Sequence, residues 1–203
     1  MRLIAFILFS NLVFAVSIPK AFEAKFLEVD SQSLRGEKRY PVLMKYKFKG
    51  HIYYEIQKED AQSLYVCNPT TTWFYKPPFI KGEPGELSVG KSNKYCYSKI
   101  FDTLSSANPG FKLFKRTSQG KVATYVFSKE VQKQMGMTKV VLEFKEQARP
   151  AVDFASLLKL SLYKSGSDRP VVLELKQLEK EPKFNSKTFH FTPPKNTIKK
   201  VLR

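Results

Sequence analysis

Apolar and polar residues alternate along much of the chain, the pattern of a strand with one buried face. The alternation is strictest over residues 42–49, where one side carries Met44, Tyr46 and Phe48 and the other carries only lysine after Leu43. This stretch predicts a half-buried strand whose charged side faces water.

The same alternation returns after the dipeptide Gly50-His51, with Ile52, Tyr54 and Ile56 on one side. The two segments therefore predict a hairpin. Further candidate strands are centred on Val140-Leu142-Phe144, Leu158-Leu160-Leu162, Val171-Leu173-Leu175 and Phe189-Phe191. Short turn sequences separate them, which favours antiparallel neighbours, and we expect about nine to eleven strands.

Helical patterns are scarce. Residues 97–107 place Ile100, Phe101 and Leu104 on one helical face and end at Asn108-Pro109-Gly110. Residues 21–27 and 128–135 could each form one or two further turns.

So few helices cannot cover so broad a sheet. The fold class we predict is mainly β: a single curved antiparallel sheet forming an unclosed half-barrel, with a small helical lid over an apolar cavity. A second packed sheet is the alternative.

Residues 64–87 hold the most specific pattern in the chain. If Asn68-Pro69-Thr70-Thr71 is a turn, Val66 lies opposite Trp73 and Leu64 lies opposite Tyr75. A shifted register that opposes Leu64 to Trp73 leaves the four side chains on one face. This face is apolar and aromatic, and we expect it to line the cavity.

The N-terminus has the layout of a secretory signal peptide over residues 1–17, which would leave a mature domain of residues 18–203. The apolar stretch is shorter than the ~20 residues of a bilayer-spanning helix. We therefore expect an exported protein. In an oxidising compartment Cys67 and Cys96 are expected to form a disulfide rather than two free thiols.

The chain has 35 Lys and Arg against 18 Asp and Glu, a net charge of +17. Outside the cytoplasm such a charge favours anionic membrane surfaces over nucleic acid, unless the lysines are simply the solvated side of a sheet. Two histidines and two cysteines are too few for most metal sites, so no metal or other cofactor is expected. His51 and His190 stand apart and no nucleophile motif is present, which argues against an enzyme.

Three stretches carry a resemblance to a known family: Val66-Cys67-Asn68, the run from Thr72 to Pro77, and Thr188-Phe189-His190-Phe191-Thr192-Pro193-Pro194. They resemble the periplasmic outer-membrane lipoprotein carriers of the LolA family. The resemblance implies a periplasmic monomer that carries lipoprotein acyl chains from an inner-membrane ABC-type exporter to an outer-membrane receptor.

The alternating strands and the helical face, taken with the resemblance, give a set of expected site residues. The expected cavity residues are Met44, Tyr46, Phe48, Ile52, Tyr54, Ile56, Leu64, Val66, Trp73, Tyr75, Leu158, Leu160, Leu162, Leu173, Phe189 and Phe191. The expected lid residues are Ile100, Phe101 and Leu104. Where family members latch the lid with an arginine, this chain has Lys49, which lacks the guanidinium fork.

Two other functions are compatible with these features: a carrier of other anionic lipids, and a lipid-sensing periplasmic regulator of the same fold. Lys45, Lys47 and Lys49 alternate away from the expected cavity face. We therefore expect them to assist docking to anionic membranes or acidic partners rather than to touch cargo.

Overall fold

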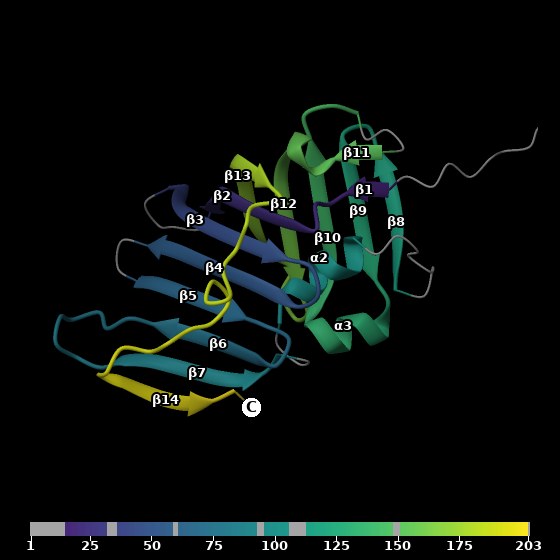
Figure 1. The fold of residues 1–203 in the computed structure, drawn as a ribbon. Helices are drawn as coiled ribbons and strands as arrows, with labels where there is room; N and C mark the ends of the chain where they lie inside the picture. Colours follow the sequence, from purple (N-terminus) through teal and green to yellow (C-terminus); the bar gives the residue numbers. More distant parts are fainter. Residues whose placement is uncertain are drawn as a thin grey trace, which may run out of the picture.

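The alternating segments form one large sheet and a small two-stranded one (Figure 1). The computed structural model describes residues 15–31, 36–58, 61–92, 96–105, 113–147 and 151–202. The strands are β1 (Ala15–Ser17), β2 (Ala21–Asp30), β3 (Lys38–Lys47), β4 (His51–Lys58), β5 (Ala61–Cys67), β6 (Thr71–Lys76), β7 (Gly85–Lys91), β8 (Phe114–Gln119), β9 (Val122–Phe127), β10 (Met137–Phe144), β11 (Ala151–Asp153), β12 (Leu157–Lys164), β13 (Pro170–Lys180) and β14 (Thr197–Val201).

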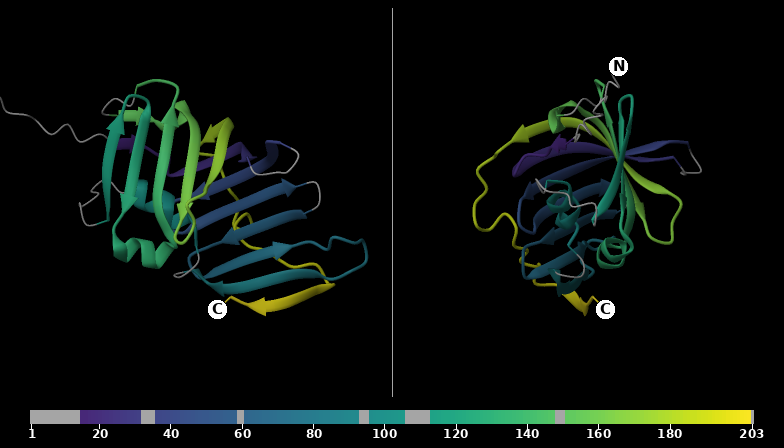
Figure 2. Two further views of the ribbon diagram at one scale, coloured as in Figure 1. Left: turned by 180° about the vertical axis from the view of Figure 1, so that it is seen from behind. Right: turned by 90° about the vertical axis from the view of Figure 1, so that its right-hand side faces the viewer.

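The large sheet has twelve strands in the order β14-β7-β6-β5-β4-β3-β2-β13-β12-β10-β9-β8. Every neighbouring pair is antiparallel except β14 and β7, which run parallel. Its end strands, β14 and β8, do not pair with each other, so the sheet is curved but not closed into a barrel (Figure 2). The predicted fold class, a mainly β chain with one large curved sheet that does not close, is confirmed.

The described helices are α2 (Ser98–Ser105), α3 (Lys129–Met135) and the short 3-10 helix η1 (Phe154–Ser156). Helix α3 begins after Ser128, whose hydroxyl accepts from the Val131 amide, and ends at Gly136 with a positive φ of 65°. Both helices agree with the predicted patterns, although the expected stop at residues 108–110 lies outside the described part of the chain.

Two elements differ from the prediction. Residues 21–27 are strand, not helix, because Phe22, Ala24 and Phe26 alternate into the core and β2 pairs on both sides with β3 and β13. Phe189 and Phe191 lie in an irregular segment that crosses the sheet instead of joining it. Alternating aromatic residues therefore occur here both in a strand of the sheet, β2, and in an irregular segment outside it, and the alternation alone does not tell one from the other.

The predicted signal peptide falls mostly on residues 1–14, outside the described residues. Its last three residues form β1, which pairs in parallel with β11. Val16 in β1 is only 6% exposed and belongs to the main core.

The predicted hairpin of β3 and β4 is confirmed. Met44 lies opposite Tyr54 and Tyr46 lies opposite Ile52. The turn at residues 48–50 has positive φ angles at Lys49 (72°) and Gly50 (93°). The hairpin therefore presents one apolar side to the concave face of the sheet.

Candidate functional site: the concave face and its lid

Helix α2 covers the concave face with the apolar side that the sequence predicts. Ile100, Phe101 and Leu104 are at most 7% exposed. The ring of Phe101 lies 5.4 Å from that of Phe22 and 5.2 Å from that of Tyr46, both on strands of the sheet. The helix is thus a lid whose underside is fixed by aromatic contacts.

The space beneath this lid is filled by side chains. Phe22 and Phe154 pack with ring centroids 5.2 Å apart, and Phe22, Tyr46 and Phe154 are each fully buried. Where the sequence predicts an apolar cavity, Phe22, Tyr46, Phe101 and Phe154 form a packed aromatic layer between sheet and lid. A ligand of any size can enter here only if α2 moves away from the sheet.

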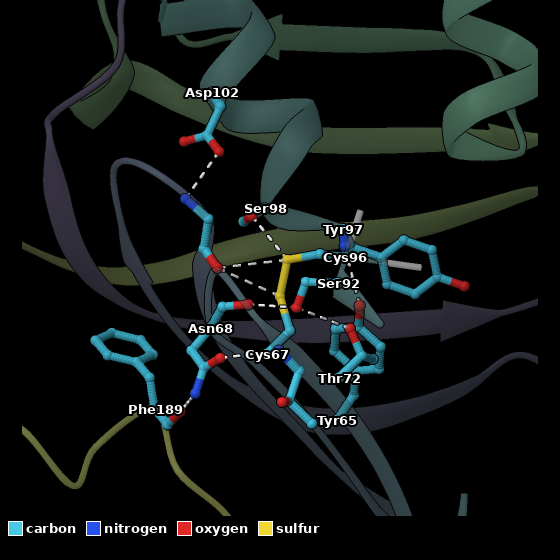
Figure 3. Close-up of a disulfide and its surroundings, with 12 residues drawn as sticks. Tyr65, Cys67, Asn68, Thr72, Ser92, Cys96, Tyr97, Ser98, Asp102 and Phe189 are labelled. Carbon is cyan, nitrogen blue, oxygen red and sulfur yellow. Dashed lines mark hydrogen bonds between the residues drawn. A yellow bond between two sulfur atoms is a disulfide. The ribbon is translucent and has the colours of Figure 1, made fainter. Parts of the chain in front are cut away.

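A carboxylate fastens the lid (Figure 3). Asp102 of α2 accepts hydrogen bonds from the Tyr46 hydroxyl at 2.8 Å, the Lys49 amide at 3.1 Å and the Gly50 amide at 3.0 Å. Burial raises the pKa of Asp102, and the hydrogen bonds oppose that rise. Burial, followed by the charge of Asp102, raises the pKa of Tyr46.

This latch differs from the predicted one. The side chain of Lys49 is exposed, and the residue contributes its backbone amide, while the charged partner sits on the helix. Asp102 was not predicted because a polar residue beside an apolar helical face usually points to water. The Lys49-Gly50 turn, whose amides need acceptors, is the signal that could have suggested it.

The predicted disulfide joins Cys67, at the end of β5, to Cys96, just before α2 (Figure 3). The Ser98 hydroxyl lies 2.8 Å from the Cys96 sulfur. Beside it, Tyr97 stacks on Tyr65 at 4.8 Å, and its amide donates to the Tyr65 hydroxyl at 3.0 Å. The N-terminal end of the lid is therefore fixed covalently, while its middle depends on the Asp102 latch.

The predicted cavity residues fall into two groups. On the concave face lie Met44, Tyr46, Phe48, Ile52, Tyr54, Ile56, Leu160, Leu162 and Leu173. Leu158 is only partly buried, because an irregularity in the pairing of β12 with β10 turns Leu157 into the core in its place.

The second group lies on the opposite, convex face, so its assignment to a face shared with Met44 was wrong: Leu64, Val66, Trp73, Tyr75, Phe189 and Phe191. The cause is the register of β4 with β5. Tyr54 pairs with Tyr65, and Ile52 pairs with Cys67, so Tyr65 and Cys67 take the concave side. Val66 opposite Trp73 and Leu64 opposite Tyr75 confirm the predicted local pairing but place all four residues outward.

The convex residues are covered by residues 181–196, which we call the strap. It runs across the outer side of the sheet before β14 (Figures 1 and 2). Phe189 packs against His51 at 5.3 Å, and Trp73 contacts His190 at 5.2 Å. Farther along, Phe191 lies 5.0 Å from the ring of Tyr75. The family-like terminal motif is thus part of a second apolar cluster, separate from the lid.

A small surface pocket of about 360 Å³ lies away from the lid. It is lined by Thr138, Lys139, Tyr163, Lys164, Gly166, Ser167 and Asp168. Six of these seven residues carry a hydroxyl, ammonium or carboxylate group, which an acyl chain would have to desolvate. In the described part of the chain, no three His, Cys, Asp or Glu side chains gather as a metal site requires.

Comparison with known proteins finds similarity in structure but none in sequence. No family model matches the chain, and no curated protein matches it. A solved domain from Vibrio parahaemolyticus, proposed by its name to be an outer membrane lipoprotein-sorting protein domain, is similar over 84% of this chain and 89% of that one, with 12% identity and a TM-score of 0.39. Within the described residues, no helix has the length and apolarity needed to cross a bilayer.

Proposed function

We propose that this protein is a carrier that binds lipoprotein acyl chains on its concave face after α2 opens. The observation that supports this proposal is the lid itself: an amphipathic helix, fixed at one end by a disulfide and in its middle by one carboxylate, covers the apolar face of an open sheet. Moving the helix would expose the aromatic layer around Phe22 and Tyr46.

The energetics of transport require such a surface. The acyl chains of a lipoprotein hold on the order of forty methylenes, and exposing each methylene to water costs roughly 0.8 kcal/mol. The gross cost of moving the chains through water is therefore tens of kcal/mol. When no cargo is bound, the lid helix packs on the apolar face and keeps it out of water. A carrier also has to release its cargo, and the competition between lid side chains and acyl chains for the same face provides moderate binding.

We also propose, from the sequence resemblance, that residues 1–17 direct export, that the carrier works in the periplasm, and that an inner-membrane exporter and an outer-membrane receptor are its partners. The net charge of +17 favours a second candidate function, transport of other anionic lipids. The two candidate functions differ in the cargo that binds, a lipoprotein or another anionic lipid.

Site-specific photocrosslinking tests the proposal. The probe is a radiolabelled tripalmitoylated lipopeptide, offered to protein that carries benzoylphenylalanine at Phe101 under the lid or, as the matched control, at Trp73 on the convex face. We expect crosslinks from position 101 and a background signal from position 73. Equal labelling at both positions, or no labelling at 101, would contradict binding under the lid. Specific labelling at position 101 that an acidic phospholipid displaces at lower concentration than unlabelled lipopeptide does would favour the second candidate.

A further inference from the structure

The loop between β6 and β7 exposes two adjacent apolar side chains. Phe79 is 77% exposed and Ile80 is 57% exposed, the largest pair of neighbouring exposed apolar residues among those described. They lie in neither the core under the lid nor the cluster under the strap. Single exposed apolar residues are common on protein surfaces, but an adjacent pair at the end of a projecting loop indicates a binding site.

The loop holds this pair in a defined shape. Pro77, Pro78 and Pro84 limit its backbone, and the Glu83 amide donates to the Ile80 carbonyl in a tight turn at 3.1 Å. Gly82 takes the positive φ of 100° that the turn needs. The apolar pair is therefore presented on a preformed tip, so that little conformational entropy is lost on binding.

The start of β14 is joined to the same loop. The Asn196 side chain donates to the Gly82 carbonyl at 3.2 Å, and the Gly85 amide donates to the Asn196 carbonyl at 3.1 Å. Lys195 precedes Asn196 in the chain, so the segment that carries it lies beside this loop; Figure 1 shows the start of β14 next to the loop between β6 and β7. Along the loop and β14 the exposed lysines are Lys76, Lys81, Lys195, Lys199 and Lys200, against two acidic residues, Glu83 and Glu86.

We propose that the β6–β7 tip docks on an anionic phospholipid bilayer, with Phe79 and Ile80 entering the headgroup region and Lys76, Lys81 and Lys195 binding the lipid phosphates. Stable peripheral attachment requires both an apolar anchor and a basic patch, and this tip supplies both. A lysine close to an anionic surface strengthens binding about fivefold. The excess of lysine selects an anionic bilayer over a neutral one. Docking needs no lipoprotein, so it stands apart from the proposed cargo binding.

Vesicle flotation with the full protein provides the test. The probes are cargo-free vesicles of phosphatidylglycerol and phosphatidylethanolamine, with neutral phosphatidylcholine vesicles for comparison. We expect binding to anionic vesicles that weakens as salt rises. The double variant Phe79→Ser/Ile80→Ser is expected to lose at least tenfold in partitioning, whereas Val126→Ser, which replaces a 44% exposed valine of β9, is expected to bind normally.

Two matched triple variants test the charges. Replacing Lys76, Lys81 and Lys195 by Gln is expected to weaken binding at least tenfold, while the same change at Lys45, Lys47 and Lys49 has a smaller effect, because Lys45 already pairs with Glu23 at 3.1 Å. A larger loss from the second triple variant would overturn the assignment to the tip, as would equal binding to neutral vesicles. If the wild type self-associates without vesicles and the Phe79→Ser/Ile80→Ser variant does not, the partner of the tip is a second copy of the chain and not a bilayer. Because no lipoprotein is present, none of these outcomes depends on the cargo.

Discussion

The Tyr46 hydroxyl, on the fully buried floor of the concave face, donates a 2.8 Å hydrogen bond to the carboxylate of Asp102 on the lid helix. This carboxylate thus connects two surfaces that meet here mainly through apolar side chains. The same carboxylate accepts from two amides of the β3–β4 turn. Hydrogen bonds of this kind specify one docked position, because sliding the helix would break all three.

Replacing Asp102 by alanine is expected to loosen the lid. Hydrogen bonds to a charged acceptor contribute about 1.5 to 3 kcal/mol, so we expect the free energy of unfolding to fall by about 2 kcal/mol. Amide hydrogen exchange in α2 should accelerate more than exchange in β12. Urea unfolding and exchange mass spectrometry measure the two effects.

The matched control is Asp168→Ala, which removes an exposed carboxylate from the β12–β13 turn. It should change stability by less than about 0.5 kcal/mol. If both variants lose the same stability, or if α2 exchanges at the wild-type rate without Asp102, the carboxylate is not the latch.

Removing the disulfide is expected to free the N-terminal end of the lid. Cys67 and Cys96 are 29 residues apart, and closing a loop of that length contributes about 3.5 kcal/mol in the chain-entropy model. The Cys67→Ala/Cys96→Ala variant should therefore unfold at lower temperature than the wild type. Thermal unfolding with and without reductant tests this, since reductant should lower the wild-type midpoint and leave the variant unchanged. A variant with the midpoint of the oxidised wild type would contradict the expectation.

The sequence predicts the concave face correctly where only one side of a strand is apolar. In β3 the residues that follow Met44 and Tyr46 are the lysines Lys45 and Lys47, so the alternation leaves one choice of face. In β5 both sides are apolar: Leu64 and Val66 alternate with Tyr65 and Cys67. Such a strand is covered on both faces, here by the lid region and by the strap, and its pattern cannot tell the inside from the outside.

The lid shows the same limit at the level of single residues. Its apolar face follows from the spacing of Ile100, Phe101 and Leu104. The role of Asp102 depends on a turn more than fifty positions earlier in the chain, and only the tertiary structure brings the two together. Long-range polar contacts of this kind leave no local periodicity to find.

Truncating the buried side chain of Phe189 is expected to detach the strap from the sheet. Phe189 is 5% exposed and packs against His51 and Phe184. The variant Phe189→Ala should lose about 2 kcal/mol or more of unfolding free energy, because truncating a buried phenylalanine leaves a cavity. The fluorescence of Trp73, the only tryptophan, should shift to the red as the strap exposes it.

Phe79→Ala is the matched control, since it makes the same truncation at a side chain that is 77% exposed. Its stability should stay within about 0.5 kcal/mol of the wild type. Equal losses in the two variants, or an unchanged Trp73 emission in Phe189→Ala, would show that the strap does not depend on this contact.

The strap should also weaken as the pH falls, through His51. Burial, followed by the charge of Lys47, lowers the pKa of His51 below its usual value of about 6.5, while the Phe48 carbonyl and Asp102 act in the opposite direction. Between the lowered pKa and about 6.5 the unfolded chain binds more protons than the folded one, so the contribution of His51 to stability is complete above pH 6.5 and declines below it.

Urea unfolding at several pH values from 5 to 8 should show this decline in the wild type, and His51→Asn should flatten it. His190→Asn, which changes the other strap histidine contact, should retain the decline. The same slope in His51→Asn and in the wild type would assign the acid sensitivity to other groups, and the ring contact between His51 and Phe189 would then carry no pH dependence.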